Sequence, residues 1–377
     1  REGLAIAEVP ETREAAHRAL EAVAGDAPFR DHRGSTITTA WSPDGKLVLT
    51  TSLDFDARLW TPAGDSVALL RGHGGKVLGG AFSPDGTRIL TWSVDHTARL
   101  WDREGTLRHT LGGHTGELIT ATFAPDGERV LTVSLDGTAR LWTLDGEPLL
   151  TAAVEGDLVR TAYATAGTEA IQVVTVDGAH ETFERAGADE VLVEKHPTPG
   201  AVETLVVSAD GTRWTVLTDQ ADVQLHTPAG VRTLKGHAAQ PLDAAFSPDG
   251  ELVATGALDS TARLWTVDGE PVATLQGHGG AVFQVAFSPD GQRLLTVSWD
   301  RTARVWDLEG HELTVLGSKA DPLVAAAFSP DGTLILTRAY HGGAARLWRV
   351  DGTLLQVLPD DTGRTLAAVF SPDAVSY

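Results

Sequence analysis

Threonine, histidine and aspartate side chains recur along the chain at fixed spacing, and together they are the ingredients of a hydrolase triad. Five histidines each precede an aspartate by 22 residues, a threonine lies four residues before that aspartate, and a tryptophan follows it by six. A hydroxyl, an imidazole and a carboxylate can serve as nucleophile, general base and orienting group. The five sets are His32, Thr50, Asp54 and Trp60; His73, Thr91, Asp95 and Trp101; His114, Thr132, Asp136 and Trp142; His237, Thr255, Asp259 and Trp265; and His278, Thr296, Asp300 and Trp306.

The number of copies favours architecture over catalysis, because an enzyme needs one active site, so we predict no catalytic residue in these sets. The 13 histidines fall mostly one to a unit, without the close pair and third carboxylate of a zinc site. The Asp-Gly pairs lack the alternating acids of a calcium loop, and no phosphate-binding loop or dinucleotide fingerprint is present. Cysteine is absent, which removes thiolate chemistry. The sequence therefore predicts no metal and no cofactor.

A turn motif with the sequence Ser-Pro-Asp-Gly divides the chain into the units that carry these residues. Its closing glycines, degenerate copies included, fall at residues 45, 86, 127, 167, 211, 250, 291 and 332, with spacings of 41, 41, 40, 44, 39, 41 and 41. In each unit an apolar stretch leads into the turn, and three further short stretches follow with turns between them. This pattern predicts four antiparallel strands per unit. Since one such sheet cannot bury both faces, we expect the units to stack around a ring.

A Gly-His pair followed by a strand that ends in tryptophan, repeated with this period, resembles the WD-repeat family over roughly residues 27–374. The resemblance implies an all-β WD40 propeller of four-stranded antiparallel blades. It also implies that the repeated residues form a structural network, in which aspartate bonds to histidine, histidine to the hydroxyl, and the hydroxyl to the indole N–H. Such a network ties the tight turn to the strands and satisfies buried polar groups.

An arginine stands two residues before each repeated tryptophan. A guanidinium would suit an anion site, but we favour a side chain that lies between blades and pairs with an aspartate. These arginines are Arg58, Arg99, Arg140, Arg263, Arg304 and Arg346.

Eight units are legible, and a ring of seven to nine blades or part of a two-propeller array both remain open. Residues 150–235 lack the phased Gly-His, and Phe183 and His226 replace tryptophan there. We still expect two blades, because the strand phase is kept and Phe183 and Tyr163 can supply part of the packing. The segment Glu194–Gly200 is expected to protrude as a loop. The predicted units are 33–72, 74–113, 115–152, 153–195, 196–236, 238–277, 279–317 and 318–360, with a partial ninth at 361–377.

The ends of the chain predict a larger parent protein. Residues 1–26 are expected to be a helical connector from an upstream domain, and residues 27–377 the propeller. Pro10 near its start, an Ala/Leu-rich run and Gly25 as a stop favour a short N-terminal helix at Pro10–Ala24. Methionine is absent even at the first position, so we expect a piece of a longer protein.

The net charge of −21 argues against the nucleic-acid backbone and against an anionic membrane as partners, because both need clustered Lys and Arg. The sequence contains no apolar run long enough to span a bilayer and no signal-peptide pattern. The absence of cysteine fits the cytoplasmic location that we expect.

Two functions are open. We favour a non-catalytic binding or scaffold module, the sensor or protein-interaction domain of a larger bacterial signalling or defence protein. Bacterial multidomain proteins similar to this chain join such WD repeats to a STAND-type ATPase, a kinase or a caspase-like protease. The partner would then be another protein or the chain's own upstream effector domain. The alternative is an enzyme propeller with an axial substrate or cofactor site, although the repeat phase places small and apolar residues there.

The resemblance places two positions per blade on one face of the disc: the residue before the aspartate, and the fifth residue after the histidine. Every intact unit has an apolar residue at both positions, where an idle, solvated face would be polar. Either these side chains pack under the loops, or they form an apolar ring that binds a protein. Phe283 and Trp299 share one unit and are the predicted hot spot. The full set is Ile37, Leu53, Leu78, Val94, Ile119, Leu135, Leu242, Leu258, Phe283 and Trp299, with Val176 in a degenerate unit.

Overall fold

The Ser-Pro-Asp-Gly turn is held by its own side chains, which explains why the same four residue types recur. Ser42 Oγ donates to Asp44 Oδ1 at 2.7 Å and accepts the N–H of Leu47 at 2.9 Å. Gly45 closes the turn with a φ of 68°, which glycine adopts without strain, and its N–H donates to the Ser42 carbonyl at 2.9 Å. The chain therefore reverses between the first and second strands of a unit.

The computed structural model describes residues 31–153, 159–164, 168–175, 180–185, 191–196, 202–317, 322–339, 345–358 and 370. Strands in these residues form eight four-stranded sheets, each an antiparallel meander that follows chain order. The first sheet comprises β1 (Thr36–Trp41), β2 (Val48–Ser52), β3 (Ala57–Trp60) and β4 (Ser66–Leu70). The second comprises β5 (Val77–Phe82), β6 (Arg88–Ser93), β7 (Ala98–Asp102) and β8 (Leu107–Leu111). The third comprises β9 (Leu118–Phe123), β10 (Arg129–Ser134), β11 (Thr138–Thr143) and β12 (Pro148–Ala153).

The remaining five sheets continue in the same order along the chain. The fourth comprises β13 (Val159–Ala164), β14 (Ala170–Thr175), β15 (His180–Arg185) and β16 (Val191–His196). The fifth comprises β17 (Val202–Val207), β18 (Trp214–Thr218), β19 (Val223–Thr227) and β20 (Gly230–Leu234). The sixth comprises β21 (Pro241–Phe246), β22 (Leu252–Ala257), β23 (Thr261–Thr266) and β24 (Pro271–Gln276). The seventh comprises β25 (Val282–Phe287), β26 (Arg293–Ser298), β27 (Ala303–Asp307) and β28 (Glu312–Leu316), and the eighth β29 (Leu323–Phe328), β30 (Leu334–Ala339), β31 (Ala345–Arg349) and β32 (Leu354–Leu358).

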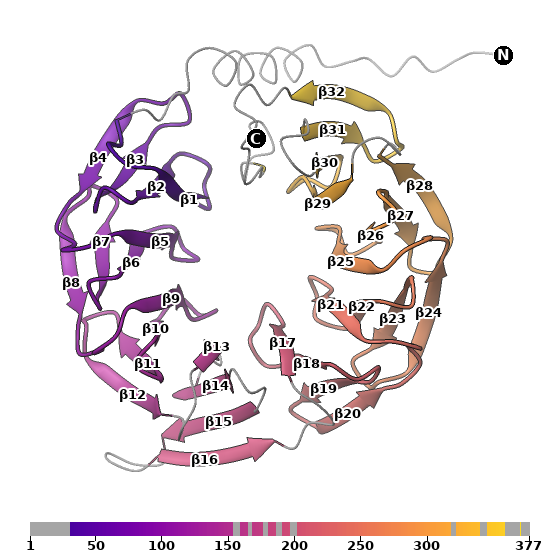
Figure 1. Ribbon diagram of the computed structural model, residues 1–377, viewed down its shortest axis with the longest axis horizontal. Helices are drawn as coiled ribbons and strands as arrows, with labels where there is room; N and C mark the ends of the chain where they lie inside the picture. Colours follow the sequence, from indigo (N-terminus) through magenta and orange to yellow (C-terminus); the bar gives the residue numbers. More distant parts are fainter. Residues whose placement is uncertain are drawn as a thin grey trace.

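The sheets follow one another around a ring, with the first strand of each nearest the centre and the fourth on the outside (Figure 1). Buried apolar clusters join most neighbours face to face. Between the second and third sheets, for example, Leu90 and Leu100 pack with Leu118 and Trp142. Period-2 alternation supplies both faces of a sheet with side chains, so a sheet can pack against a neighbour on either side.

The structure confirms the predicted all-β propeller of four-stranded antiparallel blades, and residues 150–235 contribute two of them. The expectation of a loop from Glu194 is wrong for its first three residues, because Glu194–His196 pair with β15 as the end of β16. Residues 197–200 of that loop, the helix expected at Pro10–Ala24, and the partial ninth unit apart from Phe370 lie outside the described residues. The side chain of Tyr163 lies outside them as well.

The two degenerate sheets replace the missing tryptophan differently. In the fourth sheet Phe183 takes its place and is buried against the third sheet. In the fifth sheet His226 takes its place, and Trp214 on the neighbouring strand lies directly opposite. The two rings stack with centroids 5.1 Å apart and planes 17° apart. In the fifth sheet the indole therefore stands on the second strand, β18, and not on the third, β19. The sequence pattern did not predict this compensation.

Candidate functional site

Each complete set of repeated residues forms one continuous chain of hydrogen bonds. In the third sheet, Trp142 on β11 donates its indole N–H to Thr132 Oγ1 on β10 at 2.8 Å. Thr132 Oγ1 lies 2.8 Å from His114 Nε2, and His114 Nδ1 lies 2.9 Å from Asp136 Oδ2. Asp136 also accepts the backbone N–H of Thr115 at 2.9 Å. The same contacts occur in the other complete units, around His32, His73, His237 and His278.

A neutral imidazole fits both contacts of each histidine. With its proton on Nδ1, the ring donates to the aspartate and accepts the threonine O–H at Nε2. Burial lowers the pKa of His114, His237 and His278, against the opposing effect of the aspartate beside each ring. Burial raises the pKa of Asp136, but the hydrogen bonds that it accepts, first from Thr138, outweigh burial and hold the pKa below its ordinary value. Near neutral pH the pair is therefore an imidazole beside a carboxylate.

The hydroxyl of each set has no route to a substrate. Thr132 is fully buried, and its oxygen accepts the Trp142 N–H while its proton faces His114 Nε2. A nucleophile needs a lone pair that is free to reach an electrophile. The triad-like residues are thus arranged to satisfy one another inside the sheet.

Two loops meet on the face of the disc that carries these networks. The residue before each aspartate donates its backbone N–H to the loop that follows the histidine: Leu135 to the Glu117 carbonyl, and Trp299 to the Ala281 carbonyl, both at 2.9 Å. The residue after the aspartate takes a positive φ, such as 76° at Arg301. This tight turn holds the residue before the aspartate at the rim of the face.

A β-bulge in the first strand places the second predicted position. The pairing of β9 with β10 passes from Leu118 to Thr120 and skips Ile119. A bulge leaves one residue unpaired and re-aims its side chain. The skipped residues of the other intact units are Ile37, Leu78, Leu242 and Phe283. Their spacing from the histidine identified these residues in the sequence, but the bulge was not predictable, because no glycine or other marker stands at that position.

The ten predicted residues divide into exposed and half-buried side chains. The exposed ones range from 37% for Ile37 to 64% for Trp299 and also include Leu53, Ile119, Leu135 and Leu258. Leu78, Val94, Leu242 and Phe283 are half-buried. The four half-buried side chains therefore pack under the loops, whereas the six exposed ones form an open apolar face. Val176 lies outside the described residues.

Phe283 and Trp299 stand together in the seventh sheet. Their ring centroids are 6.5 Å apart and their planes 30° apart. Phe283 also packs against the buried cluster that contains Leu323 and Ala326 of the eighth sheet. The phenyl ring is therefore a fixed support beside the indole, which remains mostly open to solvent.

The repeated arginine does not follow the predicted pairing between blades. In the described part of the chain, Arg99, Arg140 and Arg263 have no ion pair, and the Arg263 guanidinium lies 5.9 Å above the centroid of the Trp265 ring. Arg304 forms its ion pairs within its own sheet. The prediction of an inter-blade aspartate partner is wrong for these residues, whose guanidinium groups lie against the Gly-His loops instead.

Polar side chains on two first strands bridge neighbouring sheets, and the sequence analysis missed both. Asp243 Oδ2 on β21 accepts the N–H of Val285 on β25 at 2.8 Å. Gln284 bonds to both the N–H and the C=O of Ala326 on β29, each at 3.0 Å. Burial raises the pKa of Asp243 to about 6. The sequence did hold a signal for these bridges. Asp243 and Gln284 each stand in an otherwise apolar first strand, six residues after a repeated histidine.

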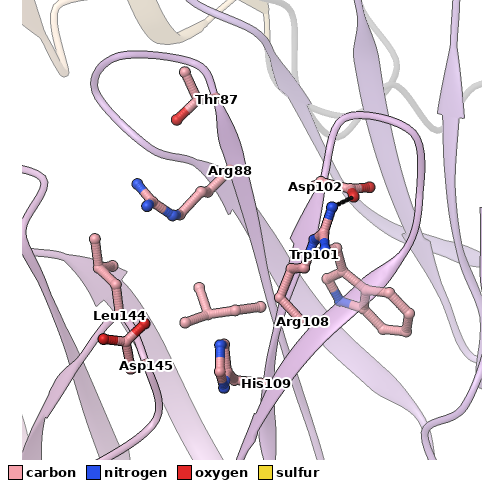
Figure 2. A pocket seen from close by; sticks show the side chains of 9 residues that line it. Thr87, Arg88, Trp101, Asp102, Arg108, His109, Leu144 and Asp145 are labelled. Atoms are coloured by element: carbon pink, nitrogen blue, oxygen red, sulfur yellow. Dashed lines mark hydrogen bonds and ion pairs between the residues drawn. The ribbon is translucent and has the colours of Figure 1, made fainter.

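A cavity of about 300 Å³ lies between the second and third sheets, beside the turns that follow their third strands. Figure 2 shows Arg88, Arg108, His109 and Asp145 around it, with Arg108 bonded to Asp102 at 2.6 Å. The Asp102 carboxylate compensates the charge of the Arg108 guanidinium. Within the described residues, no group of three or more His, Cys, Asp and Glu side chains has the arrangement of a metal site. No helix in that part of the chain is long and apolar enough to cross a membrane.

Comparison with known proteins matches the fold and the repeat. A protein-family model described as "WD domain, G-beta repeat" matches residues 27–61, 64–102, 105–143, 230–266 and 269–307. The solved C-terminal WD40 domain of Sif2 is similar at 18% identity and a TM-score of 0.60, covering 81% of this chain and 95% of its own. A structure described as the eukaryotic initiation factor is similar at 15% identity and a TM-score of 0.66, covering 87% of this chain and 89% of its own. No curated protein matches the chain.

Proposed function

The chain belongs to the WD40 family of G-beta repeats, whose propellers generally mediate protein–protein interaction, and from this premise we propose that it is a non-catalytic binding module. Its partner is another protein or the protein's own upstream effector domain. We place that protein in bacterial signalling or defence, with the propeller as its cytoplasmic sensor. This setting rests on the resemblance of the repeats alone.

The observation that carries the proposal is the apolar face above the networks. Its six exposed side chains include Trp299, which is 64% exposed beside the supporting ring of Phe283. Water solvates such a side chain poorly, and aromatic anchors on rigid supports contribute most to protein binding. The alternative of an axial enzyme site has less support, since Asp243 and Gln284 on the inner strands are engaged by backbone groups.

The test is a Phe283→Glu and Trp299→Glu double variant, assayed for thermal unfolding and for partner capture from the native host. We expect an unchanged melting temperature and loss of the captured partner, because the partner would have to bury two carboxylates at the anchor. The matched control is Leu313→Glu with Val315→Glu on β28 of the same sheet, where both residues are exposed on the outer strand. An unfolded double variant would show that the pair is core. Undiminished capture would show that this face is not the interface.

A further inference from the structure

Among the described strands, the outer strand of each sheet pairs on one side only, with the third strand, so its other edge is free. Six of these eight outer strands carry a bulge. In β4, β8, β12, β24, β28 and β32, the pairing with the third strand shifts register beside the tryptophan. Bulges twist an edge and interrupt its row of free N–H and C=O groups, which discourages pairing with another chain.

The fourth sheet lacks this protection. Strand β16, the outermost strand at the bottom of Figure 1, pairs with β15 over six consecutive residues without a shift. Strand β20 is also regular, but it pairs over five residues and presents one exposed large apolar side chain, Val231, where β16 presents three.

The side chains of β16 are exposed on both faces of the fourth sheet. Val191, Leu192 and Val193 are 40%, 54% and 48% exposed, and every described side chain of the strand is exposed. Successive residues of a strand point to opposite faces, so the apolar surface continues around the edge.

The charges beside this edge select the strand that would pair with it. Glu184 and Glu194 are exposed on the same face as Leu192, since Leu192 lies opposite Glu184 in the register. Lys195 is already engaged by Glu181 at 2.9 Å. The accessible charge at the edge is therefore negative, in a chain whose net charge is −21.

We propose that β16 is a strand-addition site for an extended segment of a partner protein in which β-branched residues alternate with lysine or arginine. The partner's backbone pairs with the free edge, its apolar residues cover Val191 and Val193, and its cations meet Glu184 and Glu194. A second copy of this chain is a poorer occupant, because it would bring the same two carboxylates to the interface. This site lies on the rim and is separate from the face that carries Trp299.

The experiment measures binding of a short fluorescein-labelled peptide of alternating lysine and valine by fluorescence anisotropy. We expect Val191→Lys with Val193→Lys to weaken binding at least about tenfold, since edge lysines oppose strand pairing and repel this peptide. The matched control is Val67→Lys with Leu69→Lys on the bulged strand β4, where both residues are exposed at the same spacing. This control variant should bind the peptide within about twofold of the unmodified chain.

A second peptide distinguishes strand pairing from charge attraction. The same sequence with N-methylated backbone amides keeps its charges but cannot complete the hydrogen bonds of an added strand, so it should not bind. Equal binding of both peptides, equal weakening by both protein variants, or no binding of the first peptide would each overturn the proposal. A dimer in sedimentation velocity that the Val191→Lys and Val193→Lys variant abolishes would overturn it in favour of a second copy. Thermal unfolding of both variants establishes that they are folded.

Discussion

The indole and the hydroxyl of each network depend on one another, and the degenerate sheets show the consequence. Where Phe183 replaces tryptophan, Val173 stands at the position of the threonine, and where His226 replaces it, Val216 does. A buried hydroxyl that loses its donor keeps the cost of desolvation, whereas removal of both partners relieves that cost. The hydroxyl and the indole have therefore been lost together.

This coupling predicts a non-additive pair of substitutions in the third sheet. Trp142→Phe alone should destabilise the fold by about 1–3 kcal/mol, because it removes a buried donor and part of the packing. The double variant Trp142→Phe with Thr132→Val should lose less unfolding free energy than the two single variants lose in sum. In the double variant no hydroxyl is left without its indole donor. Chemical denaturation of the two single variants and the double variant measures this.

His114→Ala is the companion change, with an expected loss of about 1–3 kcal/mol for the same reason. Strict additivity of the Trp142 and Thr132 changes would contradict the coupling. A hydrolytic activity that disappears from His114→Ala at unchanged melting temperature would show that the set is catalytic.

The sequence predicted which residues form the networks because five copies at constant spacing leave little freedom, and each predicted quartet is in contact. It did not predict Trp214 opposite His226, although Trp214 stands in phase with the apolar residue that faces tryptophan elsewhere. It also misplaced the arginine partners. A long side chain has many rotamers, and the choice between an ion pair and a tryptophan face depends on neighbours that sequence phase does not specify.

At the scale of strands, the Pro-Asp-Gly and Asp-Gly turns explain why four strands per unit were predictable. The backbone bulges were not, because a one-residue shift in pairing leaves the apolar pattern of β9 or β25 almost unchanged. The bulges nevertheless decide which residue reaches the interaction face. The bridges from β21 to β25 and from β25 to β29 depend in turn on single polar residues in those strands.

The Asp243 bridge predicts a pH dependence of stability. Burial raises the pKa of Asp243 from 3.8 to about 6, so the folded state holds this proton more tightly than the unfolded state. Its contribution is complete below pH 3.8 and is lost as the pH rises through about 6. Relative to Asp243→Asn, which keeps an acceptor for the Val285 N–H, the unmodified chain should lose about 1–3 kcal/mol across this window.

Urea denaturation of both chains at a series of pH values measures this difference, because contributions from all other groups cancel in it. Parallel stability curves for the two chains would show that Asp243 titrates normally.

At the scale of the whole ring, the boundary between the fourth and fifth sheets differs from the boundaries between the other sheets that follow one another along the chain. Apolar clusters contain residues of both neighbours between the first four sheets and between the last four. Between the fourth and fifth sheets, the cluster around Val216 contains residues of the fifth sheet alone among the described side chains. Gln172, Thr182 and Glu194 lie in one row across the fourth sheet, where the second has Leu90, Leu100 and His109.

A polar row against an apolar cluster stabilises less than two apolar faces. This boundary should therefore open before the boundaries between the other consecutive sheets. Amide hydrogen exchange should show lower opening free energies in β14 and β17 than in β6 and β9. Gln172→Leu with Thr182→Leu should raise protection there by about 1–2 kcal/mol, since it replaces two side chains of the polar row with apolar ones and adds apolar burial. The control is Thr215→Val on β18 of the fifth sheet. This change removes a buried hydroxyl that has no hydrogen-bond partner. It should stabilise the chain without a selective effect on β14. Equal opening free energies around the ring would show that packing at this boundary is as strong as elsewhere.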